Sequence, residues 1–160
     1  PVTLKIWRDS NLESIAAEFE KAAELQVLID WHALHSAGWS PKDMMTFVCR
    51  NQPAEQALIS RLEPMGLTYR VVNPTTIQIS TYEALEAQHE IEFYPLPGNA
   101  APEDMKQISE RIVQRIGQAK FQPAGRGAIG FDTNSRSLIV SLPQHDQVIV
   151  HALLSADATE

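Results

Sequence analysis

Cysteine, clusters of basic residues and long apolar runs are scarce in this sequence. A single cysteine, Cys49, excludes an internal disulfide framework, and its place in an apolar stretch predicts a buried small side chain rather than a reactive thiol. No apolar stretch approaches the ~18 residues of a membrane-spanning helix. The chain has no run of Lys or Arg and a net charge of −7, which disfavours nucleic acid and anionic membranes as partners.

The chain also shows neither an initiator methionine nor a signal peptide. It starts directly on residues 2–6, which alternate apolar and polar side chains like a half-buried strand, so we expect a piece excised from a longer protein. At 160 residues it allows one ordinary domain or two small ones. Hydrophobic residues at 44% and charged residues at 21% are typical of a globular protein.

Residues 51–81 carry the clearest structural pattern. Pro53 suits the start of a helix, and Gly66 suits its end, where a left-handed residue is needed. Between them, apolar residues recur at helical spacing: Ala54, Ala57, Leu58, Leu62 and Met65. Residues 67–72 and 76–81 then predict two strands joined by a turn. We expect the helix to cover one face of a small sheet.

The residues before this stretch predict a similar unit. Ser10 and Glu13 have the spacing of a capping box, which predicts a helix from Ser10 to about Leu25. Its expected buried face consists of Leu12, Ile15, Ala16, Phe19 and Ala23. A strand over 26–31, a loop over 32–43 and a strand over 44–50 follow. The pattern at 8–13 returns 42 positions later at 50–55, so we expect two βα units that share one sheet.

The remaining residues predict a second block. Residues 82–90 are acidic and read as a short helical linker. The block then has a strand over 91–96, a helix from Pro102 to Gly117, strands over 128–131 and 137–142, and a last helix from Pro143. The helix stripes are Met105, Ile108, Ile112, Val113 and Ile116, and then Val148, Ile149, Ala152 and Leu153. This order places both helices on one face of a three-stranded sheet.

Few residues are candidates for chemistry. Residues 125–130 spell GxGxxG, but the expected loop before them and strand after them do not fit a dinucleotide site, so we expect the flexible start of a hairpin. His32 and His35 have HxxH spacing without further obvious ligands, so surface histidines are expected rather than zinc ligands. We predict no catalytic residue, no metal site and no cofactor.

Two tryptophans are candidate interface residues. Trp7 ends or leaves the first strand, and Trp39 lies in a loop beside Gly38. Exposed aromatic rings can anchor a protein interface. The alternative is that both rings cap sheet edges as part of the core.

The pattern resembles the periplasmic N-terminal domains of bacterial secretins and the secretin and TonB N-terminus short domain. The matching stretches are DSNLESIAAEFEKAAELQVLID and TFVCRNQPAEQALISRLEPMGLTYRVVNPTTIQIST. The ending SLIVSLPQHDQVIVHALLS resembles the ring-building domain that follows in such proteins. The resemblance implies scaffolding: α/β modules that pack side by side in rings or dock partner proteins outside the cytoplasm, without catalysis.

We therefore predict an α+β chain of two small tandem domains, with helices packed on small mixed sheets. Domain 1–81 has the order β-α-β-β-α-β-β, 82–90 is a linker, and 91–160 has the order β-α-β-β-α. The predicted role is a non-catalytic protein–protein interaction or assembly module of a larger cell-envelope protein, periplasmic or otherwise extracytoplasmic, with protein partners and possible self-association. The alternatives are a nucleic-acid-binding KH-like module, which the charge balance opposes, and a small metal-dependent hydrolase built on His32 and His35.

Overall fold

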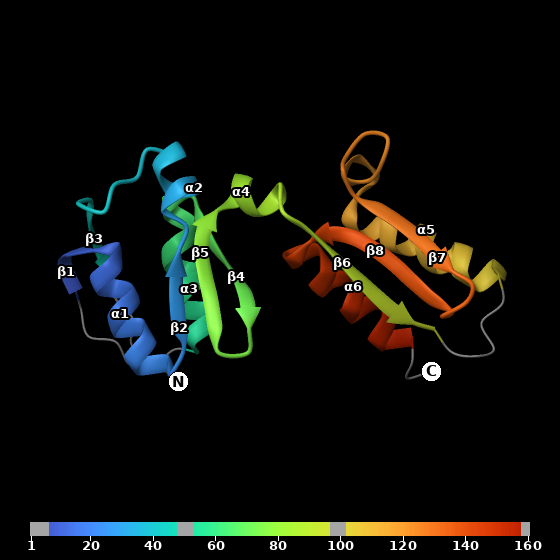
Figure 1. Cartoon of the computed structure of the whole chain (residues 1–160), viewed down its shortest axis with the longest axis horizontal. Coiled ribbons are helices and arrows are strands. Elements are labelled where there is room, and N and C mark those ends of the chain that lie inside the picture. Colours follow the sequence, from blue (N-terminus) through green and yellow to red (C-terminus); the bar gives the residue numbers. More distant parts are fainter. Residues whose placement is uncertain (1–6, 48–52, 97–101, 158–160) are drawn as a thin grey trace. The chain divides into compact units, whose positions relative to one another are not determined.

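A computed structural model describes residues 7–47, 53–96 and 102–157 (Figure 1). The fold is α+β. Its elements are β1 Trp7–Asn11, α1 Leu12–Ala23, β2 Gln26–Ile29, α2 Trp31–Ser36, β3 Met44–Phe47, α3 Ala54–Leu62, the 3-10 turn η1 Glu63–Met65, β4 Leu67–Asn73, β5 Thr76–Thr81, α4 Tyr82–Glu86, β6 His89–Pro95, α5 Pro102–Ile116, the 3-10 turn η2 Gln118–Lys120, β7 Ala128–Asp132, β8 Ser137–Pro143 and α6 Gln144–Asp157.

The chain divides into two compact units between Leu85 and Glu86, a point that lies inside segment 82–90. In this segment α4 ends at Glu86, and β6 begins at His89. The predicted strand over 2–6 and the side chain of Cys49 lie outside the described residues.

The first unit contains two small sheets among its described residues. β1 pairs antiparallel with β3, while β2, β5 and β4 form a three-stranded sheet in that order. The prediction that both βα units share one sheet is therefore wrong. The reason is that β5 pairs parallel with β2 and antiparallel with β4, so β2 and β4 flank β5 in one sheet. Among the described residues, β1 and β3 then form a separate pair.

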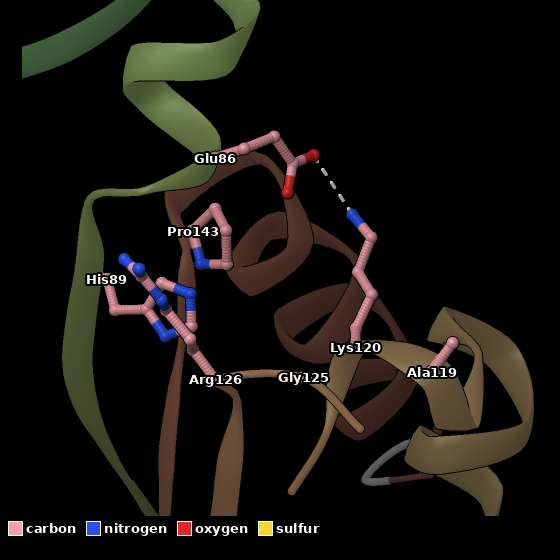
Figure 2. A pocket seen from close by; sticks show the side chains of 7 residues that line it. All are labelled: Glu86, His89, Ala119, Lys120, Gly125, Arg126 and Pro143. Carbon is pink, nitrogen blue, oxygen red and sulfur yellow. Dashed lines mark hydrogen bonds and ion pairs between the residues drawn. The ribbon is translucent and has the colours of Figure 1, made fainter. Parts of the chain in front are cut away.

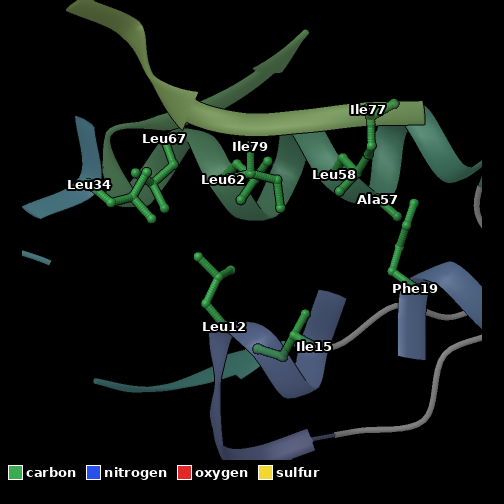
Figure 3. Packing of buried hydrophobic residues seen from close by; sticks show 10 residues of the cluster. All are labelled: Leu12, Ile15, Phe19, Leu34, Ala57, Leu58, Leu62, Leu67, Ile77 and Ile79. Atoms are coloured by element: carbon green, nitrogen blue, oxygen red, sulfur yellow. The ribbon is translucent and has the colours of Figure 1, made fainter. Parts of the chain in front are cut away.

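The core of the first unit lies between its three-stranded sheet and helices α1 and α3. In Figure 3, Ile77 and Ile79 point from β5 toward Leu58 and Leu62 of α3. The buried cluster is Leu12, Ile15, Phe19, Leu34, Ala57, Leu58, Leu62, Leu67, Ile77 and Ile79. The predicted stripes of both helices are thus confirmed, and Gly66 has the predicted left-handed backbone, with φ +70°.

Two helix starts in this unit differ from the predictions. The cap of α1 is Asn11, whose side chain accepts a hydrogen bond from Ser14 N at 2.9 Å, and not Ser10. Trp31 opens α2 rather than ending a strand, because Asp30 accepts a hydrogen bond from Ala33 N at 3.0 Å and so caps a helix there.

The second unit is a three-stranded antiparallel sheet in the order β6-β8-β7, with α5 and α6 packed on one face (Figure 1). Its buried cluster is Tyr94, Ile112, Phe121, Leu138, Val140, Leu142 and Val150. The predicted stripe of α5 is confirmed, since Ile112 is buried and Ile108, Val113 and Ile116 pack against the cluster. The strand order and the two helices agree with the predicted β-α-β-β-α.

The last helix differs from its predicted form. Pro143 ends β8 and is buried, so α6 begins at Gln144. Val148 is 65% exposed, whereas Val150 is fully buried. The predicted stripe was rotated because the inward face of α6 also carries polar residues, Asp146 and Gln147, which a count of apolar positions leaves out.

Candidate functional site

Four charged or polar side chains meet in the second unit and form what we call the ion cluster: Glu86, Lys120, His145 and Asp146. Lys120 Nζ lies 2.7 Å from Asp146 Oδ2 and 3.1 Å from Glu86 Oε1. His145 Nε2 lies 3.1 Å from Glu86 Oε1, 3.3 Å from Asp146 Oδ1 and 3.3 Å from Lys120 Nζ. The cluster ties the end of α4, the turn η2 and the first turn of α6 together.

The loop that presents Lys120 is shaped by two glycines. Gly127 N donates to Lys120 O at 2.8 Å, and Gly125 N donates to Phe121 O at 2.8 Å. A Cβ at Gly127 would meet Lys120 O at 2.7 Å, and one at Gly125 would overlap the backbone of Lys120. The glycines lie at the start of the hairpin of β7 and β8, as expected, and both let the backbone approach Lys120 closely. The flexibility of this segment stays a prediction. As predicted, a strand and not a helix follows.

The electrostatics of the ion cluster favour a charged lysine. Desolvation acts to lower the pKa of Lys120, but hydrogen bonds to Asp146 and Glu86 outweigh it, so the pKa lies above its ordinary value. Asp146 is 3% exposed and uses both carboxylate oxygens within the cluster. A lysine with a raised pKa stays protonated at neutral pH and is a poor nucleophile or base. The arrangement therefore suits an ion-paired clamp rather than catalysis.

The same residues contain one metal-type donor set. Glu86, His145 and Asp146 each offer a ligand atom within 4.8 Å of the others, and in the described part of the chain this is the one such group of three. Lys120 Nζ already supplies the positive charge between the two carboxylates. A divalent cation would have to displace this ammonium, so the donor set fits a lysine better than a metal.

A small surface pocket of about 220 Å³ lies beside the ion cluster (Figure 2). It is lined by Glu86, His89, Ala119, Lys120, Gly125, Arg126 and Pro143. In Figure 2, Glu86 and Lys120 pair with each other, and His89 and Arg126 also line the pocket. The lining mixes both signs of charge within a small volume, which gives no single ligand class an advantage.

A buried polar network fastens α6 to the sheet. Tyr94 Oη lies 2.9 Å from Glu92 Oε2 and 3.0 Å from Gln147 Oε1. Gln147 Nε2 donates to Glu90 O and Val140 O, both at 2.9 Å. Burial, and then the hydrogen bond to Glu92, raise the pKa of Tyr94 well above its ordinary value. The phenol thus stays protonated and has a structural role.

Strand β6 carries an inverted pattern of side chains. Residues directly opposite in an antiparallel pair share a face, so Glu92 and Tyr94, opposite Val140 and Leu138, lie on the helix-covered face. Ile91 and Phe93 lie on the other face, which we call the outer face, and are 64% and 61% exposed. The strand therefore turns acidic side chains toward the helices and large apolar ones toward solvent.

The two predicted interface residues, Trp7 and Trp39, lie in different parts of the first unit. Trp39 is half-buried and packs against the core cluster of the first unit. Trp7 belongs to β1, but its side chain lies outside the described part of the structure. His32 and His35 are exposed on α2, and the His35 ring lies 5.7 Å from that of Trp31.

Sequence reasoning missed both Lys120 and the outer-face pair Ile91 and Phe93. The alternation Glu-Ile-Glu-Phe in residues 90–93 was a usable signal for a two-faced strand. Its usual interpretation puts the apolar side chains inside. The opposite orientation arises because Tyr94 belongs to the core and the strict two-residue period then turns Ile91 and Phe93 outward.

No protein-family model and no curated protein sequence matches the chain. Several solved structures are similar to it, among them the following three. The type IV competence pilus secretin PilQ of V. cholerae has TM-score 0.39 and 15% identity over 96% of this chain and 37% of its own. The Salmonella type III injectisome basal body structure of InvG, PrgH and PrgK has TM-score 0.36 and 11% identity, covering 96% of this chain and 28% of the other.

The third is the GspC–GspD complex of the enterotoxigenic Escherichia coli type II secretion system, with TM-score 0.32 and 10% identity over 99% of both chains. The chain thus spans well under half of the chains matched in the first two structures. Because these TM-scores are low, the residues of the chain itself have to carry any assignment of function. None of the described helices combines the length and apolar character that a bilayer-spanning segment requires.

Proposed function

We propose that the chain is a non-catalytic protein–protein interaction and assembly module of a larger, secretin-like cell-envelope protein, placed in the periplasm or otherwise outside the cytoplasm. The observation that carries the proposal is the inverted strand β6. Ile91 and Phe93 expose large apolar side chains next to each other on the outer face. Exposed aromatic and aliphatic side chains grouped on one surface are typical of protein interfaces.

The charged groups support the same proposal. In the ion cluster Lys120 pairs with both carboxylates, and the pKa values of Lys120 and Tyr94 are both raised, which leaves these groups protonated. The resemblance of the sequence pattern to periplasmic secretin domains supports the compartment and the assembly role. The net charge of −7, without a basic cluster, opposes a KH-like role in nucleic-acid binding.

The test is capture of partners from bacterial cell-envelope extracts on the immobilised chain. The double variant Ile91→Ser, Phe93→Ser removes the apolar pair, and Val148→Ser, at a residue that is 65% exposed on α6, is the matched control. We expect the wild-type chain and V148S to retain the same polypeptides, in competition with free chain, and the double variant to lose them. Retention by all three would contradict the assigned surface. A chain that retains nothing and stays monomeric in light scattering would contradict the function.

A further inference from the structure

The backbone of β6 has one paired edge and one free edge. β6 pairs with β8 over all seven of its residues, and in the described residues no strand pairs with its other side. Leu96 N donates to Arg136 O at 3.0 Å, which marks that pair as hydrogen-bonded across the ladder. Antiparallel ladders alternate hydrogen-bonded and non-hydrogen-bonded pairs. Residues 90, 92 and 94 therefore bond toward β8.

The same alternation gives Ile91 and Phe93 a special position. Their N–H and C=O groups point to the free edge, while their side chains lie on the exposed outer face. Main-chain donors and acceptors and apolar anchors thus occur at the same two residues. An exposed edge of this kind is a template for an added strand, in which main-chain hydrogen bonds give affinity and alternate side chains give specificity.

The charges at this edge favour a strand from another protein over a second copy of β6. Glu90 and Glu92 lie on the helix-covered face at this edge. If two copies of β6 paired antiparallel, the registers centred on residue 91 or 92 would set glutamates directly opposite each other, which is destabilising. The register centred on Phe93 would use Pro95, which has no N–H to donate. A partner with a cation opposite Glu92 avoids both costs.

We propose that the free edge of β6 binds an extended segment of another protein as an added antiparallel strand. Apolar residues of that segment lie beside Ile91 and Phe93, and a Lys or Arg lies beside Glu92. The carboxylate of Glu92 takes a hydrogen bond from Tyr94 and has acceptor capacity for a cation. This inference rests on the proposed function and specifies the chemistry of the partner.

The test uses a synthetic capped peptide, Lys-Val-Lys-Val-Lys-Val-Lys, which matches β6 in length. It is titrated into the full chain and followed by the NMR signals and hydrogen exchange of individual amides. We expect the amides of Ile91 and Phe93 to shift and their exchange to slow by about tenfold or more, as an added hydrogen bond requires. Ile129 and Phe131, whose amides point to the free edge of β7 by the same alternation, are the internal control and should not change.

Two modified peptides test the hydrogen-bonding mode without altering the protein. Valines opposite Ile91 and Phe93 would point their backbone N–H groups at β6. Methylating the backbone nitrogens of the valines should therefore abolish binding. Methylating the backbone nitrogens of the lysines should leave binding intact, because their backbone N–H groups point away from β6. A non-alternating peptide of the same composition controls for simple charge attraction and should bind poorly. The variant Glu92→Gln should weaken binding of the unmodified peptide about two- to fivefold, as loss of one partly exposed ion pair does.

Three results would overturn the inference: no change at Ile91 and Phe93 at millimolar peptide, equal binding of the valine-methylated peptide, or a dimer of the free chain in which these amides are protected. If the peptides fail while I91S/F93S still abolishes capture from extracts, the proposed function stands and strand addition is wrong. If nothing is captured by the wild-type chain, the proposed function itself fails. Melting curves of E92Q distinguish lost binding from lost folding, and the methylated peptides require no variant.

Discussion

Lys120 holds the ion cluster together because its ammonium contacts both carboxylates at once. Replacing it by methionine keeps most of the side-chain volume but leaves the buried Asp146 without its cation. We expect K120M to lower the free energy of unfolding by about 1–3 kcal/mol. The control is K106M, which removes an exposed pair with Glu110 at 3.9 Å and should cost less than about 0.5 kcal/mol. Urea denaturation of both variants measures the difference; equal effects would contradict a structural role for the cluster.

Tyr94 makes the second unit sensitive to alkaline pH. Its pKa is raised above the ordinary 10.0, so the unfolded chain ionises this phenol before the folded chain does. Its contribution to stability is therefore fully present below about pH 10 and is lost as the pH rises further. We expect Y94F to be less stable by about 1–2 kcal/mol at neutral pH and to lose less stability than wild type between about pH 9 and 11.

The matched control for Tyr94 is Y82F, because Tyr82 is exposed and its hydroxyl lies 3.3 Å from Glu63. Unfolding by urea at a series of pH values measures both variants. Y82F should follow the pH dependence of the wild type. An unchanged alkaline slope in Y94F would show that the buried phenol does not couple folding to pH.

Among the elements, the first turn of α1 separates two adjacent candidate caps. The sequence pattern predicted Ser10, whereas the structure uses Asn11. We expect N11A to cost about 1 kcal/mol and S10A less than about 0.5 kcal/mol, since the side chain of Asn11 caps the N–H of Ser14. Urea unfolding followed by tryptophan fluorescence measures both. A larger loss in S10A would restore the capping box predicted from the sequence.

The three glycines of residues 125–130, Gly125, Gly127 and Gly130, have different surroundings. A methyl group at Gly127 would meet Lys120 O and Leu142 Cδ2 at 2.7 and 2.8 Å, whereas one at Gly130 would meet nothing within 4 Å. We expect G127A to destabilise by about 1–3 kcal/mol and G130A to change stability by at most about 0.5 kcal/mol. Thermal unfolding compares the two; a neutral G127A would mean that the loop tolerates displacement and does not position Lys120.

The elements also show where apolar periodicity is informative and where it fails. It located α1, α3 and α5 and their buried faces, because those faces are almost wholly apolar. It misplaced the face of α6, where Asp146 and Gln147 are buried through hydrogen bonds and ion pairs with other elements. It also gave no orientation for β6, because that depends on which residues of β8 lie opposite.

On the scale of the whole molecule, the tryptophans allow the two units to be observed separately. Trp7, Trp31 and Trp39 all lie before the boundary at Leu85. If the units fold independently, L62A should shift the tryptophan transition in urea by about 2–5 kcal/mol of unfolding free energy, since Leu62 is buried in the first core. K120M should leave the tryptophan transition unchanged and shift only a transition seen by circular dichroism. A single transition that both variants move would contradict two independent domains.

The sequence could predict the α+β class and the order of elements in the second unit, because both depend on local periodicity and turn residues. In the first unit it missed helix α2, which lies mostly within the predicted loop and begins at the cap Asp30. It could not predict the ion cluster, since Glu86, Lys120 and Asp146 come from three distant segments and meet only through tertiary packing. The sequence also could not predict the outer-face pair. Ile91 and Phe93 are exposed because the helices cover the opposite face of the sheet.

Amide hydrogen exchange along β6 of the free chain shows whether the outer edge of this strand is open to a partner. We expect an alternating pattern, with slow exchange at Glu90, Glu92 and Tyr94, which bond to β8, and fast exchange at Ile91 and Phe93, which face the free edge. Uniform protection of all five amides would mean that another part of the protein already pairs with this edge. That result would contradict a surface open to a partner strand.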